Sequence, residues 1–193
     1  PSMYDLGNFV LEQALWDSKL FLQQNPDFFI NVNVSAKQLE RPDFCRVVLE
    51  LLDKTEFPVR HLCLEITERC RSLPVSVINE RMAVLRGYGI KFAMDDFGTG
   101  SSSSAMALEM LIDEIKIDMS FIRKILVNKK NKAIVQSMVD FANAANIKSC
   151  LEGVENKALE DYLRTVGATW FQGYYYSKPV GADELEILLS AKK

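Results

Sequence analysis

Short strand-like segments alternate with longer helical segments, and this order constrains the fold more than any other feature of the chain. Strands are predicted at residues 27–34, 62–67, 90–95, 113–118, 147–152 and 169–174, where β-branched and aromatic residues are frequent. Helices are predicted at residues 3–22, 44–52, 134–142 and 156–167. Parallel strands need helical connections of this kind, so the sequence predicts a parallel sheet, either open or closed into a barrel.

The two faces of each predicted strand differ in polarity. Ile30, Val32 and Val34 form one apolar face, whereas Asn31 and Asn33 share the other. The polar faces of the six strands end at Asn33, Glu65, Asp95, Lys116, Glu152 and Gln172. An open sheet with helices on both sides is apolar on both faces. A barrel with its chemistry at the carboxyl ends of its strands explains the difference, so we expect these six side chains to converge at one mouth.

Composition narrows the class of protein. A chain of 193 residues with 48% hydrophobic residues can form one domain, and we treat 1–193 as a single domain. The formal net charge is −3, and there is no basic stripe, signal peptide or long apolar run. We therefore expect no DNA or RNA partner, no membrane segment and a cytoplasmic location with reduced cysteines. The single histidine, His61, is expected to be structural.

The segment "MDDFGTG" places two adjacent carboxylates, Asp95 and Asp96, at the end of a buried strand. Carboxylates brought together repel one another, and a divalent cation relieves the repulsion. Oxygen ligands without histidine or cysteine favour Mg²⁺ or Mn²⁺ over zinc. Two such ions suit attack on a phosphodiester, with Lys116 beside them. From the residues alone, an ordinary turn after the strand and a surface lysine remain alternatives.

Six motifs in this order resemble the EAL domain, the bacterial cyclic di-GMP phosphodiesterase family. They are "NVNVSAKQL", "LEITE", "MDDFGTG", "EIKIDMSFI", "LEGVE" and "FQGYYYSKP", and they extend over nearly the whole chain. The resemblance implies a modified TIM-type (β/α) barrel that hydrolyses cyclic di-GMP to linear pGpG with Mg²⁺ or Mn²⁺. It also implies a sensory or GGDEF-type domain in the parent protein, and it leaves a homodimer open.

The resemblance also implies roles for individual residues. Metal ligands are expected at Asn33, Glu65, Asp95, Asp96 and Glu152. Lys116 is expected to contact the attacking water, and Glu152 to act as a general base. Residues expected to support the active site or to bind substrate are Glu68, Asp118, Glu155 and Gln172, of which Glu68 holds the "DFGTG" loop.

One departure from the family concerns its name. No Glu-Ala-Leu motif, which supplies a further metal ligand, occurs in these 193 residues. A (β/α)₈ barrel typically needs about 250 residues. We therefore expect an incomplete barrel that lacks the first strand, with weak or absent activity in the chain itself. The alternative is a catalytically inactive module that binds cyclic di-GMP or another protein.

Overall fold

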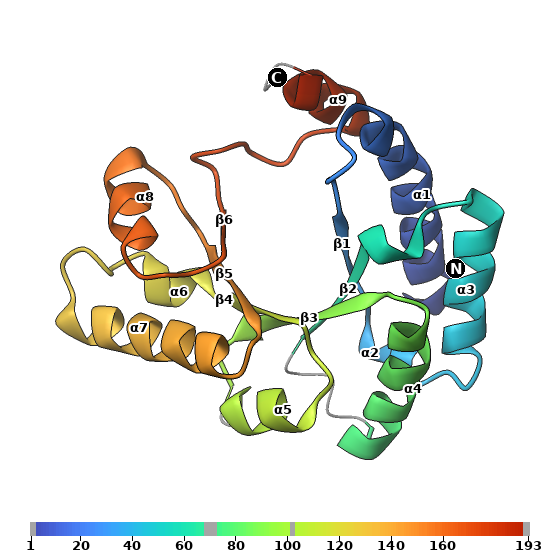
Figure 1. Ribbon diagram of the computed structural model, residues 1–193, viewed down its shortest axis with the longest axis horizontal. Helices are drawn as coiled ribbons and strands as arrows, with labels where there is room; N and C mark the ends of the chain where they lie inside the picture. Colours follow the sequence, from blue (N-terminus) through green and yellow to red (C-terminus); the bar gives the residue numbers. More distant parts are fainter. Residues whose placement is uncertain (1–2, 68–72, 101–102, 191–193) are drawn as a thin grey trace. The chain divides into compact units, whose positions relative to one another are not determined.

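The computed structural model describes residues 3–67, 73–100 and 103–190, and the chain divides into two compact units. Unit 1 comprises Pro1–Phe92, Glu109–Leu111 and Val180–Lys193, and unit 2 comprises Ala93–Leu108 and Ile112–Pro179. Parallel strands alternate with helices in both units, as the sequence predicts (Figure 1). The six described strands follow the order β1-β2-β3-β4-β5-β6 in the sheet.

Unit 1 contains the first two strands and the helices that cover them. Its elements are α1 (Met3–Gln24), β1 (Ile30–Asn33), α2 (Ala36–Leu39), α3 (Phe44–Thr55), the 3₁₀ helix η1 (Val59–His61), β2 (Leu62–Thr67), α4 (Val75–Gly87) and α9 (Ala182–Ser190). β1 and β2 pair in parallel, with Ile30 opposite Leu62 and Asn33 opposite Glu65. The two polar strand ends therefore lie at matching positions.

The core of unit 1 is built from the apolar faces of its helices. Leu11 and Leu15 of α1 and Val48 and Leu52 of α3 are buried at helical spacing. α1 lies beside α3 and α9 (Figure 1). Helices on one face of β1 and β2 leave the opposite, polar strand face available for chemistry.

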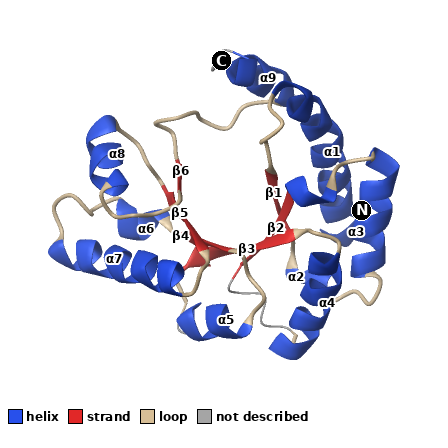
Figure 2. Ribbon diagram, in the orientation of Figure 1, coloured by secondary structure: helices blue, strands red, loops and turns tan. Residues whose placement is uncertain are grey.

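Unit 2 contains the other strands. β3 (Lys91–Phe97) begins in unit 1, and its residues from Ala93 onward belong to unit 2. The other elements are α5 (Ser103–Glu109), β4 (Glu114–Ile117), α6 (Met119–Ile122), α7 (Lys129–Ala144), β5 (Lys148–Glu152), α8 (Lys157–Arg164) and β6 (Trp170–Gln172). β3 pairs in parallel with β4, β4 with β5, and β5 with β6 (Figure 2).

All six predicted strands are present, although most are shorter at one or both ends than predicted. β1 begins only at Ile30, because a turn occupies residues 26–27. The helix expected over 156–167 begins at its N-cap Asn156 but ends at Arg164. Gly167 lies beyond its last turn with a φ of 87°, which glycine adopts without steric cost.

Candidate active site

Lys116 lies buried between two carboxylates within unit 2. Its ammonium nitrogen is 2.9 Å from Oε1 of Glu152 and 3.5 Å from Oδ1 of Asp95. The Lys116 side chain is 6% exposed, against 17% for Asp95 and 16% for Glu152. Ion pairs shielded from water interact more strongly than surface pairs, because solvent and salt screen them less. The structure thus brings together three of the residues expected from the sequence.

An extra residue in β3 explains why two acidic residues occur side by side. The pairs that flank the irregularity are Met94 with Ile115 and Phe97 with Ile117. Asp95 and Asp96 therefore share the one position opposite Lys116, which is the arrangement of a β-bulge. Asp96 has a φ of 56°, a conformation that side-chain-bearing residues seldom adopt. The bulge departs from the strict alternation of a regular strand, in which neighbouring side chains point to opposite faces.

The charges of this cluster do not balance. Asp95 and Glu152 supply two carboxylates against the one ammonium of Lys116, so these three groups in their ionised forms have a formal charge of −1. Burying like charges is unfavourable unless a counterion compensates them. The excess of carboxylate over ammonium groups suits a bound cation.

The ends of β5 and β6 are joined tightly. Glu152 lies opposite Gln172, and the next residue, Gly173, approaches the main chain of Val154. A Cβ atom at Gly173 would lie 2.2 Å from the carbonyl oxygen of Val154. The Val154 N–H donates to the carbonyl of Gln172, and the Tyr175 N–H donates to that of Val154, each at 3.0 Å. Residues after β6 therefore fix the segment that follows Glu152.

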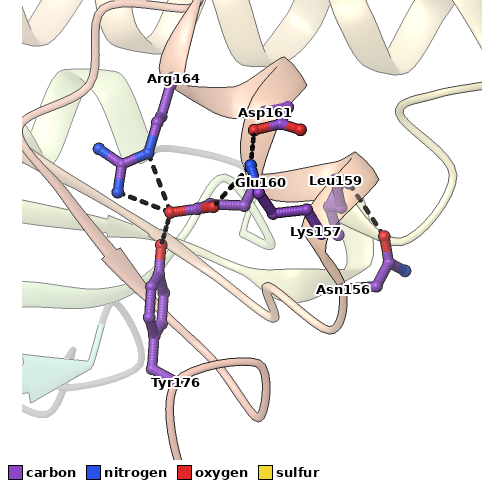
Figure 3. Close-up of polar contacts among 7 residues, drawn as sticks. All are labelled: Asn156, Lys157, Leu159, Glu160, Asp161, Arg164 and Tyr176. Carbon is purple, nitrogen blue, oxygen red and sulfur yellow. Dashed lines mark hydrogen bonds and ion pairs between the residues drawn. The ribbon is translucent and has the colours of Figure 1, made fainter.

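A second contact ties the segment after β6 to α8 (Figure 3). The Tyr176 hydroxyl donates to Oε1 of Glu160 at 3.3 Å, and Arg164 donates to the same oxygen through Nε and Nη2 at 2.9 and 2.6 Å. Burial, followed by the Glu160 carboxylate, raises the pKa of Tyr176. Asn156 caps α8 by accepting a hydrogen bond from the Leu159 N–H at 2.9 Å.

The remaining predicted residues of unit 2 are placed differently. Asp118 is the N-cap of α6, and its Oδ1 accepts a hydrogen bond from the Ser120 N–H at 2.9 Å. The Glu155 side chain is 53% exposed, and its Oε1 is 4.0 Å from Nε of Arg123. These contacts of Asp118 and Glu155 are with residues other than Lys116. Glu68 falls in 68–72, outside the residues that the structure describes.

In unit 1, Glu65 is buried within β2, two residues before its last residue, with an exposed fraction of 4%. Asn33 lies directly opposite it on β1, and Nδ2 of Asn31 donates to its Oε1 at 2.9 Å. Asn33 also lines a pocket of about 430 Å³ with residues of α1 and α2. Asn33 and Glu65 are thus neighbours, as the alternation of polar residues predicts.

His61 has a structural role in unit 1. Its Nδ1 hydrogen-bonds the carbonyl of Phe28 at 2.6 Å, and its Nε2 accepts a hydrogen bond from Nε of Arg60 at 3.1 Å. Both ring nitrogens are therefore engaged, in agreement with the sequence interpretation.

The side chains of both units suit a hard divalent cation. Carboxylate and amide oxygens are the ligands that Mg²⁺ and Mn²⁺ prefer. Oδ1 of Asn31 is buried and accepts no hydrogen bond from the described residues. An oxygen atom that could bind a metal ion therefore lies near Glu65 without a partner among those residues. Within the described ranges, no three histidine, cysteine or acidic side chains are grouped closely enough to define a metal site by themselves. These side chains thus suit Mg²⁺ or Mn²⁺ because they present oxygen atoms and because carboxylates outnumber the ammonium group around Lys116.

Sequence reasoning missed the contact of Asn31 with Glu65 and the bulge at Asp95–Asp96. The position of Asn31, two residues before Asn33 on the same strand face, was a usable signal for the first. The bulge had only the doubled aspartate as a signal.

Parallel strands joined by helices, with acidic and amide side chains toward their carboxyl ends, are typical of α/β barrel-type proteins. The chain belongs to the EAL domain family, whose model matches residues 2–179. No described helix is both long enough and apolar enough to cross a bilayer.

Individual relatives support this assignment. The cyclic di-GMP phosphodiesterase PdeA of Borreliella burgdorferi is 31% identical over 91% of this chain and 26% of its own length. The EAL enzyme Bd1971, solved with cAMP and cyclic di-GMP, has a TM-score of 0.93 and 32% identity over 98% of this chain and 53% of its own. The PaMucR phosphodiesterase complex with cyclic di-GMP has a TM-score of 0.87 and 30% identity over 94% of this chain and 74% of its own. These likenesses confirm the TIM-type fold class, and the chain spans about a quarter of the length of the curated relatives.

Proposed function

We propose that this chain is the catalytic domain of a phosphodiesterase that hydrolyses cyclic di-GMP to linear pGpG. The observation that carries the proposal is the buried cluster of Asp95, Lys116 and Glu152. It occurs in an EAL domain, and relatives with this domain are named cyclic di-GMP phosphodiesterases.

The proposed metal ligands are Asn33, Glu65, Asp95, Asp96 and Glu152. Bound Mg²⁺ or Mn²⁺ would supply Lewis acidity to the phosphate and lower the pKa of a water molecule. The support is the hard-oxygen character of these side chains and the excess of carboxylates over the one ammonium among Asp95, Lys116 and Glu152.

Lys116 and Glu152 would act on the attacking water. The Glu152 carboxylate accepts a proton from the water as its oxygen bonds to phosphorus. The bond from phosphorus to the 3′ oxygen breaks, that oxygen takes a proton from solvent and leaves as a hydroxyl, and Glu152 returns its proton to solvent. One water is consumed for each bond cleaved. Lys116, 2.9 Å from Glu152, holds the base in place and offsets negative charge on the phosphate. Glu68, Asp118, Glu155 and Gln172 are proposed supporting or substrate-binding residues.

Turnover of the protein at the full length encoded by its gene tests this proposal. With Mn²⁺, wild-type protein should produce pGpG, and Glu152→Gln or Lys116→Ala should lower the rate by about 10²–10⁴-fold, the usual loss for one positioned catalytic group. The controls are Glu184→Gln and Lys148→Ala, which alter exposed residues of α9 and β5.

Near-normal turnover in either active-site variant would remove that residue from the mechanism. Tight binding of cyclic di-GMP by wild-type protein without any pGpG would favour the alternative of an inactive binding module.

The proposed function also has consequences for the partner domains and the location of the protein in the cell. Curated relatives are about four times as long as this chain, and one is a bifunctional diguanylate cyclase and phosphodiesterase. We propose a sensory or GGDEF-type domain as the partner of this domain, with a homodimer as a second arrangement to test. The described cysteines are free thiols, which supports a reducing, cytoplasmic setting.

A further inference from the structure

Asn31 lies in unit 1 on the same face of β1 as Asn33. It is opposite Cys63 in the register, two pairs before the match of Asn33 with Glu65. Its Nδ2 reaches along the strands to Oε1 of Glu65 at 2.9 Å. The contact is shielded from water, since Glu65 is 4% exposed.

The chemistry of the contact fixes the orientation of the amide. An ionised carboxylate only accepts hydrogen bonds, so the nitrogen of Asn31 must face Glu65 and its oxygen must point away from it. That oxygen, Oδ1, is buried and accepts no hydrogen bond from the described part of the chain. A buried carbonyl oxygen without a partner is unfavourable, and structures seldom keep one without a reason.

A purely structural asparagine at this position would satisfy both ends of its amide or expose the free end to water. Asn31 does neither, and its partner is a residue that the proposed function assigns to the metal. Metal-binding side chains are commonly oriented by a second residue that hydrogen-bonds their other polar atom.

We propose that Asn31 is a positioning residue of the divalent-cation site. It holds the Glu65 carboxylate through Nδ2 and offers Oδ1 to the hydrated cation. This inference rests on the proposed function, because it requires that Glu65 bind a metal ion. It adds a residue outside the ligand set expected from the sequence.

Mn²⁺ binding without cyclic di-GMP tests the inference, with free Mn²⁺ followed by electron paramagnetic resonance. Asn31→Ala should weaken Mn²⁺ binding by about 10–100-fold, the usual effect of removing a residue that orients a ligand. Glu65→Gln should weaken it as well. The double variant should bind only slightly more weakly than Glu65→Gln alone, because the main contribution of Asn31 is through Glu65.

Two further variants separate this role from a general effect on folding. Asn143→Ala removes a hydrogen bond to the Gly167 carbonyl in unit 2, and it should leave Mn²⁺ affinity unchanged. Asn31→Asp places a second carboxylate beside Glu65, so the apo protein should melt at a lower temperature than wild type. Added Mn²⁺ should then raise its melting temperature by more than it raises that of wild type.

The outcomes distinguish the inference from the proposed function. Wild-type binding of Mn²⁺ that Glu65→Gln weakens and Asn31→Ala leaves intact would overturn the role of Asn31 alone. Additive losses in the double variant would also overturn it, because Asn31 would then act independently of Glu65. Wild-type protein that binds no Mn²⁺ would overturn both the metal site and this inference.

Discussion

Single residues in this protein carry contacts that a residue type alone does not predict. Asp95 and Asp96 share one position opposite Lys116 because β3 contains an extra residue there. The positive φ of Asp96 is a strained conformation that costs of order 1–3 kcal/mol, and such strain is concentrated at functional sites. The doubled aspartate therefore marks the bulge at which Asp95 pairs with Lys116.

Tyr176 links stability to pH at the residue scale. Burial and the Glu160 carboxylate raise its pKa. Between the ordinary and the raised pKa, the unfolded chain has lost the phenol proton that the folded chain keeps. The free energy of unfolding therefore falls as the pH rises through about 10.

We expect Tyr176→Phe to lower the free energy of unfolding by about 0.5–1.5 kcal/mol near neutral pH, where the hydroxyl donates to Glu160. The alkaline decline should be shallower than in wild type, as measured by urea unfolding across this pH range. Tyr88→Phe, at a residue that is 59% exposed, is the control. Equal declines for wild type and Tyr176→Phe would show that Tyr176 makes no such contribution.

At the scale of elements, the segment after Glu152 is held by its neighbours. Val154 exchanges main-chain hydrogen bonds with the chain on both sides of Gly173, and α8 begins at Asn156. A loop fixed at both ends positions the carboxylate that precedes it.

The cap of α8 gives a prediction at this scale. Asn156→Ala removes the hydrogen bond to the Leu159 N–H and should destabilise the protein by about 1 kcal/mol in chemical denaturation. Asn156→Asp keeps an acceptor at the N-cap and should retain most of the stability. An alanine variant as stable as the aspartate variant would contradict the capping role.

Short segments rich in β-branched and aromatic residues were sufficient to predict the six strands. Alternating polarity then predicted which strand face packs on helices. Helices with a single apolar face, such as α3, were also predictable. α4 was not predicted, since Val75, Val77 and Val84 add apolar residues outside its buried face of Ile78, Met82 and Leu85. Bulges, caps and the contact between Asn31 and Glu65 depend on register and on tertiary neighbours, which periodicity does not encode.

At the scale of the whole molecule, the assignment to the EAL family rests on the sequence motifs. The structure shows in addition which charged side chains contact one another in each unit. Unit 2 contains a lysine enclosed by acids, and unit 1 contains a buried glutamate held by an asparagine. Each arrangement contains carboxylate or amide oxygen atoms of the kind that bind a divalent cation. Cation binding and phosphodiester hydrolysis are therefore proposed as properties of the same protein.

Hydrolysis of cyclic di-GMP in ¹⁸O-labelled water tests the central claim most directly. The full-length protein with Mn²⁺ should yield pGpG with one ¹⁸O in its terminal 5′ phosphate, because water attacks phosphorus and the 3′ oxygen leaves unlabelled. Chelation of the metal or the change Glu152→Gln should suppress the labelled product. Recovery of unchanged cyclic di-GMP from wild-type protein, or a product without ¹⁸O in that phosphate, would contradict the account.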